Sequence, residues 1–70
     1  MRGMQENAKF LGTVRVWRDG EVYRWAPPSS ERVPENAIEA EHYRGTDGKD
    51  VLYVDFGDSG QFYHDAVKAD

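Results

Sequence analysis

Short runs of β-branched and aromatic residues, separated by glycine-containing turns, constrain the fold of this chain more than any other feature. The run Phe10–Trp17 is followed by Asp19-Gly20 and then by the run Val22–Trp25. An Asp-Gly pair between two such runs is typical of a β-hairpin. The first third of the chain is therefore expected to form two paired strands.

The same pattern recurs in the second half of the chain. The run Val51–Phe56 is expected to be the clearest strand, and the Gly57–Gly60 turn connects it to another strand over 61–64. Residues 37–43 fit two descriptions: their Ala and Glu content after Pro34 favours a short helix, whereas their alternation favours a strand. We expect five short strands in a small, strongly bent barrel, with an α+β fold containing a helix near 35–43 as the alternative.

The register of the first hairpin decides which aromatic side chains share a face. A two-residue Asp19-Gly20 turn would place Tyr23 on the opposite face from Trp17. A three-residue loop, with Gly20 in the left-handed conformation, pairs Val16 with Val22 and places Trp17, Tyr23 and Trp25 on one face. We favour the second register because it separates an aliphatic core face from an aromatic face. Three prolines keep residues 26–36 in a loop after this hairpin.

The length and charge of the chain limit what it can do. Seventy residues form one small domain, expected over residues 9–70 after a flexible leader over residues 1–8. The net charge is −4, and 8 of the 13 acidic residues lie in the second half. A basic surface is needed to bind the nucleic-acid backbone, so direct binding of nucleic acid is disfavoured and a cationic partner is favoured. We expect a monomer.

The residues that carry chemistry do not form a catalytic pattern. The chain has no cysteine, no glycine-rich phosphate loop, and a Gly57–Gly60 segment that fits a turn better than a nucleophile elbow. The spacing of His42 and His64 does not match a metal site. We therefore expect a non-enzymatic protein without metal or cofactor. Because it has neither a secretory signal nor an apolar run of about 20 residues, we expect a soluble intracellular protein.

Aromatic residues are the most informative part of the composition. Two Trp, four Tyr and three Phe are many for a core this small, and several lie at the ends of the two hairpins. Aromatic faces next to a carboxylate are what a cation–π cage requires. The alternative is that these rings simply cap a thin aliphatic core.

The segment Val51–Asp58 resembles the signature of Tudor domains, in which a strand ends in two aromatic residues, Gly and then Asn or Asp. The segment Val16–Tyr23 is similar to the first Tudor hairpin. Tudor domains are five-stranded SH3-like barrels that bind methylated arginine or lysine of a partner peptide. The resemblance implies this fold and an aromatic cage whose members are Trp17, Tyr23, Tyr53 and Phe56, with Asp58 or Asp55 supplying charge.

A second hypothesis assigns the exposed aromatic residues to a different role. A small acidic protein, of the kind that phages use as inhibitors or accessory subunits, can dock on a larger enzyme or nucleic-acid-processing assembly. Asp47, Asp50, Asp55 and Asp58 would then steer the chain toward a basic partner. Recognition of a cationic peptide segment remains the leading hypothesis.

Overall fold

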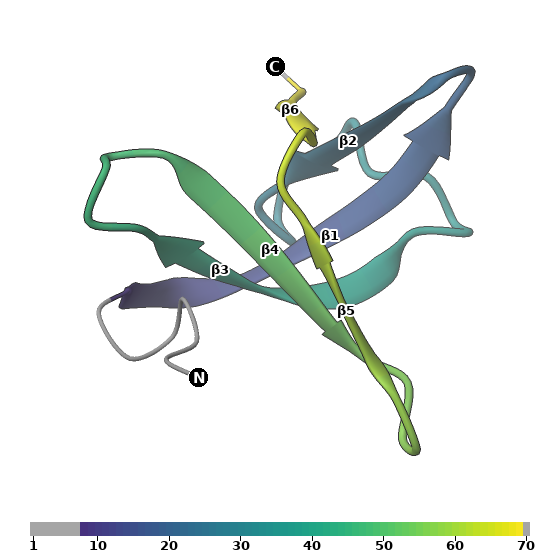
Figure 1. Cartoon of the computed structure of the whole chain (residues 1–70). Helices are drawn as coiled ribbons and strands as arrows, with labels where there is room; N and C mark the ends of the chain where they lie inside the picture. Colours follow the sequence, from purple (N-terminus) through teal and green to yellow (C-terminus); the bar gives the residue numbers. More distant parts are fainter. Residues whose placement is uncertain (1–7, 70) are drawn as a thin grey trace.

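The computed structural model describes residues 8–69, all of whose regular elements are β-strands (Figure 1). The six strands are β1 (Lys9–Asp19), β2 (Val22–Ala26), β3 (Ile38–Arg44), β4 (Asp50–Asp55), β5 (Gly60–Tyr63) and β6 (Val67–Lys68). They form one sheet in the order β5-β4-β3-β1-β2-β6, curled into a half-barrel. The flexible leader expected over residues 1–8 lies, apart from Ala8, outside the described residues.

The prediction of an all-β chain is confirmed, and the alternative with a helix near 35–43 is wrong. Strand β3 covers most of that segment, and its Ala40 and His42 side chains are buried while Glu39 and Glu41 are exposed. In a strand, alternate side chains point to the same face, so Ala40 and His42 can both be buried against the core. This burial outweighs the helix propensity of Ala and Glu. The structure has six strands rather than five, because the C-terminal tail adds β6 parallel to β2.

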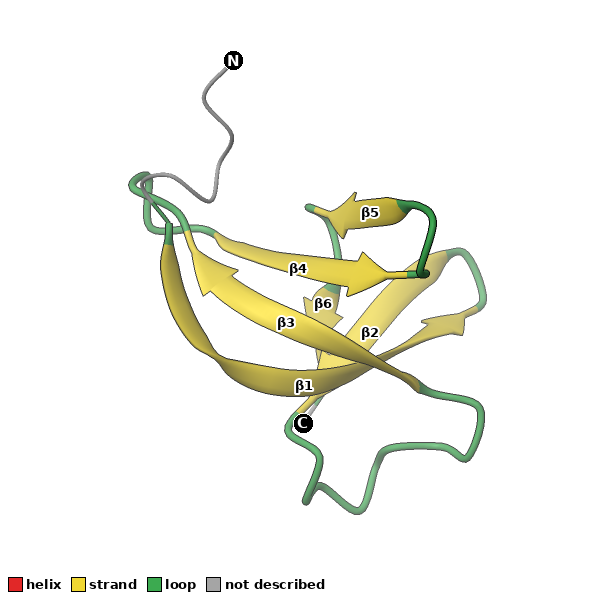
Figure 2. Cartoon of the chain, turned by 90° about the horizontal axis from the view of Figure 1, so that it is seen from below, coloured by secondary structure: helices red, strands yellow, loops and turns green. Residues whose placement is uncertain are grey.

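The sheet is not a simple meander, because β1 lies between β2 and β3. The segment over residues 27–37 connects β2 to β3 outside the sheet (Figure 2). Its prolines support local turns, in which Ser30 N–H donates to the Pro27 carbonyl at 3.0 Å and Ala37 N–H to that of Pro34 at 3.2 Å. This long connection lets the chain cross to the free edge of β1.

Both registers considered for the first hairpin are wrong. Asp19 pairs with Val22 and Val16 with Trp25, so the turn consists of Gly20 and Glu21. Gly20 has a φ of +67° whereas Glu21 does not have a positive φ, which is the pattern of a type II′ turn. This register buries the large Trp25 side chain, which is 5% exposed, and leaves the smaller Val22 40% exposed.

The curl of the sheet brings its two ends together. Strand β1 is long and bends at a register shift between Phe10 and Gly12, where Gly12 has a φ of +131°. Figure 2 shows β1 curving along its length, with β5 facing β2 across the open side of the half-barrel. Tyr23 of β2 and Tyr63 of β5 pack against the core from the two sides of this opening.

The core is a compact cluster inside the curl, formed by Val14, Val16, Trp25, Ala40, Leu52 and Val54. The buried His42 lies at its edge, with its ring centroid 4.5 Å from that of Trp25 and its Nε2 hydrogen-bonded to Asp50 at 2.9 Å. Arg44 Nε also donates to Asp50, at 2.7 Å. The Nε2 atom of this histidine therefore has a partner despite burial. Across residues 8–69 the structure contains no helix with the length and apolarity needed to cross a bilayer.

Candidate functional site

A groove of about 300 Å³ opens between the start of β2 and strand β5. Its walls carry four rings and two carboxylates, contributed by Glu21, Tyr23, Phe62, Tyr63, His64 and Asp65. The groove exists because the curled sheet leaves its two ends unpaired where β2 faces β5. The residues that form it come from segments about 40 positions apart in the sequence.

The strand registers point the two tyrosine rings toward each other. Tyr63 lies opposite Leu52 on the inner face of β5, and Tyr23 lies opposite Arg18 on the inner face of β2. Their ring centroids are 4.7 Å apart with an interplanar angle of 67°, an edge-to-face arrangement. Burial, together with the neighbouring Tyr23, raises the pKa of Tyr63, so its phenol is neutral at physiological pH.

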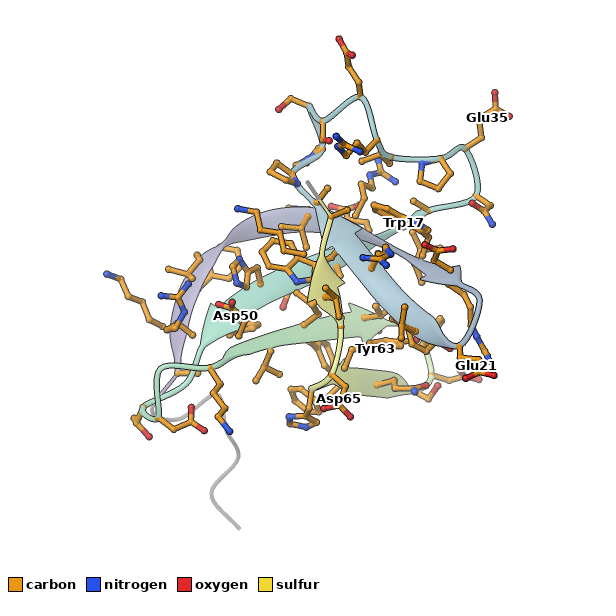
Figure 3. The ribbon with its side chains drawn as sticks, turned by 90° about the horizontal axis from the view of Figure 1, so that it is seen from above. Trp17, Glu21, Glu35, Asp50, Tyr63 and Asp65 are labelled. Carbon is orange, nitrogen blue, oxygen red and sulfur yellow. The ribbon has the colours of Figure 1, made fainter. Side chains whose placement is uncertain are left out.

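The charges around the groove are mainly negative. Glu21 and Asp65 are both exposed, and Figure 3 shows them on the same side of the molecule as Tyr63. Within residues 8–69, neither carboxylate takes part in a salt bridge. The guanidinium of Arg18 lies over the Tyr23 ring, 5.6 Å from its centroid, so one ring of the groove already attracts a cation.

Trp17 does not belong to this groove. Pairing with Arg24 puts its side chain on the opposite face of the hairpin from Tyr23. There it lines a separate hollow with Arg24 and Arg32, near the proline-rich loop. The change of register explains this separation, since the predicted register placed Trp17 and Tyr23 on one face.

The other predicted cage residues lie on and beyond β4. Tyr53 is on the outer face of that strand, with its ring over Gly60 and its centroid 4.8 Å from that of Phe62. Phe56 is 50% exposed and lies, like the exposed Asp58, in the turn between β4 and β5. The structure thus places Trp17, Tyr23 and Tyr53 in three separate hollows. A binding role for the five residues that the resemblance implies stays a prediction.

Tyr53 borders a smaller acidic hollow of about 180 Å³, together with Glu39, Glu41 and Asp55. Glu41 accepts a hydrogen bond of 2.7 Å from the hydroxyl of Tyr43. This hydrogen bond, with some contribution from burial, raises the pKa of Tyr43. The hollow has one ring and three carboxylates, whereas the groove has four rings and two carboxylates.

The two histidines lie in different environments. His42 belongs to the core and is hydrogen-bonded to Asp50, whereas the exposed His64 borders the groove. No group of three or more His, Cys, Asp or Glu side chains within residues 8–69 is arranged to hold a metal ion.

Sequence reasoning placed one residue of the groove, Tyr23, in the binding site. The lining residues that it did not place there are Glu21, Val22, Phe62, Tyr63, His64, Asp65 and Ala66. Local signals indicated that Tyr63 lies on a strand, but not that β5 faces β2. That proximity results from the curl of the whole sheet, which no local pattern encodes. The comparison of the chain with protein families, with curated proteins and with solved structures finds no match.

Proposed function

We propose that this chain is a non-enzymatic binding domain that recognises a cationic side chain of a partner peptide in the groove between β2 and β5. The observation that carries the proposal is that two packed tyrosines and two exposed carboxylates surround one hollow of about 300 Å³. Aromatic rings attract cations, and nearby carboxylates add electrostatic attraction. Tyr23 is retained from the cage that the resemblance implies, and Tyr63 and Phe62 form the other walls.

Methylated lysine or arginine is the ligand class that this lining fits best. Val22 and Ala66 border the groove beside the rings, so part of the wall is apolar. Methylation removes hydrogen-bond donors from the ammonium or guanidinium group and spreads its charge over an apolar surface. Rings and methyl groups can contact such a group without leaving polar atoms unpaired.

Arg18 is an internal competitor for the ligand. Its guanidinium lies 5.6 Å from the centroid of the Tyr23 ring, where a cationic ligand would gain the same attraction. In this proposal the incoming cation displaces Arg18 or binds beside it. The variant Arg18→Gln is therefore expected to bind the ligand more tightly than the unmodified chain.

The proposal of a Tudor-type, SH3-like domain rests on the residues Val51–Asp58 and on the curled all-β sheet. Under this proposal, a methylated residue of a partner peptide is the ligand of the groove. The chain acts as a monomer that requires no cofactor.

One observation favours the second candidate function, docking on a basic surface of a larger assembly. Phe56 is 50% exposed, and the exposed Asp55 and Asp58 lie on either side of it in the sequence, so an apolar anchor is flanked by acidic residues. If docking through this turn is the function, Phe56→Ala will abolish recovery of a single stoichiometric partner in a pull-down. Tyr63→Leu will leave that recovery unchanged.

An NMR titration tests the proposed function and locates the site. The probes are the amides of N-acetyl-trimethyllysine and N-acetyl-dimethylarginine, added to the isotope-labelled chain at up to millimolar concentration. We expect the amide shifts to cluster at Tyr23 and over residues 62–66. We expect Asp65→Asn to weaken binding, and the matched control Glu35→Gln, in the proline-rich loop away from the groove (Figure 3), to leave binding unchanged.

Shifts that cluster instead at Tyr53, Phe56 and Asp58 would contradict the groove and favour the turn after β4. The absence of clustered shifts with both probes would contradict recognition of a methylated cation altogether.

A further inference from the structure

Strand β5 has a free edge beside the groove. It is the terminal strand of the sheet, and β4 is its one paired neighbour within residues 8–69. The opposite end of the sheet is less open. Its edge strand β6 has two residues, which pair with Arg24 and Trp25 and so cover that part of β2. A strand added to β5 would therefore lie over the groove, next to the part of β2 that β6 does not cover.

The hydrogen-bond pattern shows which backbone groups face this free edge. Phe56 N–H donates to the Ser59 carbonyl at 2.8 Å, which makes 56 and 59 a hydrogen-bonded pair. Hydrogen-bonded and non-hydrogen-bonded pairs alternate along an antiparallel ladder. Gln61 and Tyr63 therefore bond to β4, whereas the backbone N–H and C=O groups of Gly60 and Phe62 point outward.

The edge of β5 lacks the features that normally prevent strand addition. Its sequence Gly-Gln-Phe-Tyr contains no charged residue and no proline, in a chain whose residues are 31% charged. Protected edge strands carry lysine, proline or bulges, or are very short, as β6 is here. The four residues of β5 therefore offer an unprotected template for another strand.

The charges around β5 decide which strand can add. Asp58 precedes β5 and Asp65 follows it, and both are exposed. Antiparallel pairing of two copies through β5 would bring the Asp58 and Asp65 carboxylates of both copies to the same edge, where like charges repel each other. A basic segment meets two favourable charges in the same place. The edge therefore favours a basic partner over a second copy.

We propose that the partner binds as an extended basic segment that adds to the free edge of β5 and places one cationic side chain in the groove. The proposal rests on the proposed function and adds the way in which the partner's backbone is held. Main-chain hydrogen bonds to Gly60 and Phe62 supply affinity, and the groove selects the side chain. The segment alternates its side chains, so that one face points to the Tyr23–Tyr63 pair and the other to solvent.

Backbone methylation of a probe peptide tests strand addition directly. The probe is an acetylated, amidated heptapeptide of alternating threonine and valine with a central trimethyllysine. Two isomers carry methyl groups on alternate backbone nitrogens, one set along each edge of the extended peptide. The parent peptide and the two isomers have the same charge and the same side chains, so each isomer is a control for the other.

Strand addition predicts that one isomer binds at least about tenfold more weakly than the parent peptide, while the other binds within about twofold of it. It also predicts that the saturating parent peptide slows amide exchange at least about tenfold at Phe62, but not at Gln61 or Tyr63. Equal effects of the two isomers, or unchanged exchange at Phe62, would overturn the proposal.

The single amino-acid probe separates this proposal from the proposed function. If N-acetyl-trimethyllysine amide binds in the groove and the heptapeptide binds no more tightly, strand addition is wrong and cation recognition stands. If neither probe binds, both proposals fail.

Discussion

Tyr23 and Tyr63 pack edge to face across the open side of the half-barrel, with their ring centroids 4.7 Å apart. They join β2 to β5, two strands that the sheet order places far apart. The same two rings line the groove. One contact therefore links the curvature of the sheet to the candidate site.

A double-mutant cycle measures the energy of this contact. We expect Tyr23→Ala and Tyr63→Ala to show a coupling of about 1 kcal/mol in urea unfolding, because each change removes a ring that the other packs against. A cycle between Tyr23→Ala and Phe56→Ala is the control, since the exposed Phe56 lies in the turn after β4. Additive effects of the two tyrosine changes, within about 0.3 kcal/mol, would show that the ring contact does not hold the curl.

Gly60 is required by the position of the Tyr53 ring. A Cβ atom at residue 60 would overlap the phenol of Tyr53. We expect Gly60→Ala to destabilise the fold by about 1–3 kcal/mol in urea unfolding, because the ring must leave its place against Phe62. Most of this loss should disappear in the background of Tyr53→Ser, which removes the ring. Ser59→Ala is the control, and an equal cost of Gly60→Ala in both backgrounds would contradict the packing of Tyr53 over Gly60.

Asp50 makes the stability of the fold depend on pH. Partial burial favours its neutral form, but hydrogen bonds from His42 and Arg44 outweigh burial and hold the pKa of Asp50 below its ordinary value. The carboxylate therefore contributes stability above its unfolded-state pKa, and this contribution is lost as pH falls through the folded-state pKa.

We expect Asp50→Asn to lower the free energy of unfolding by about 1 kcal/mol at neutral pH, since these hydrogen bonds are partly solvated. Urea unfolding at neutral pH and below about pH 3 measures the change, and the difference from the unmodified chain should shrink in acid. Asp58→Asn, at an exposed turn position, serves as the control. A difference that stays constant over this range would exclude the charge of Asp50 as the cause.

Most strands of this fold were predictable because they have a local signal, but residues 37–43 fitted a helix as well and β6 was not among the expected strands. Residues 38–44 show the alternation of a half-buried strand, and residues 51–54 form a run of apolar, β-favouring residues. The turns at Gly20 and Gly57 use the positive φ that glycine permits. The register of the first hairpin was not predictable from the turn alone. In the favoured register Val16 pairs with Val22 and Trp25 faces away from the core. In the structure Val16 pairs with Trp25 instead, which places Trp25 on the inner face, and this choice depends on the space beside Val16 and His42.

The cation-binding role of the candidate site stays a prediction, and the sequence did not predict where the groove lies. Excess aromatic residues next to carboxylates indicated a cation-binding surface, and Tyr23 is part of the groove. Its partner Tyr63 comes from β5, which meets β2 because β1 bends and because β3 crosses to the far side of β1. These are properties of the whole sheet, so the resemblance of two short segments could not reveal them.

The affinity of the groove for a cation compared with its neutral isostere tests the central claim most directly. The two ligands are N-acetyl-trimethyllysine amide and the analogue in which carbon replaces the quaternary nitrogen. They are titrated by NMR into the unmodified chain, into the double variant Glu21→Gln/Asp65→Asn, and into the control Glu35→Gln. We predict that the cation binds at least about fivefold more tightly to the unmodified chain and the control. This preference should shrink in the double variant. Equal affinities of the two ligands for the unmodified chain would contradict cation recognition by the groove.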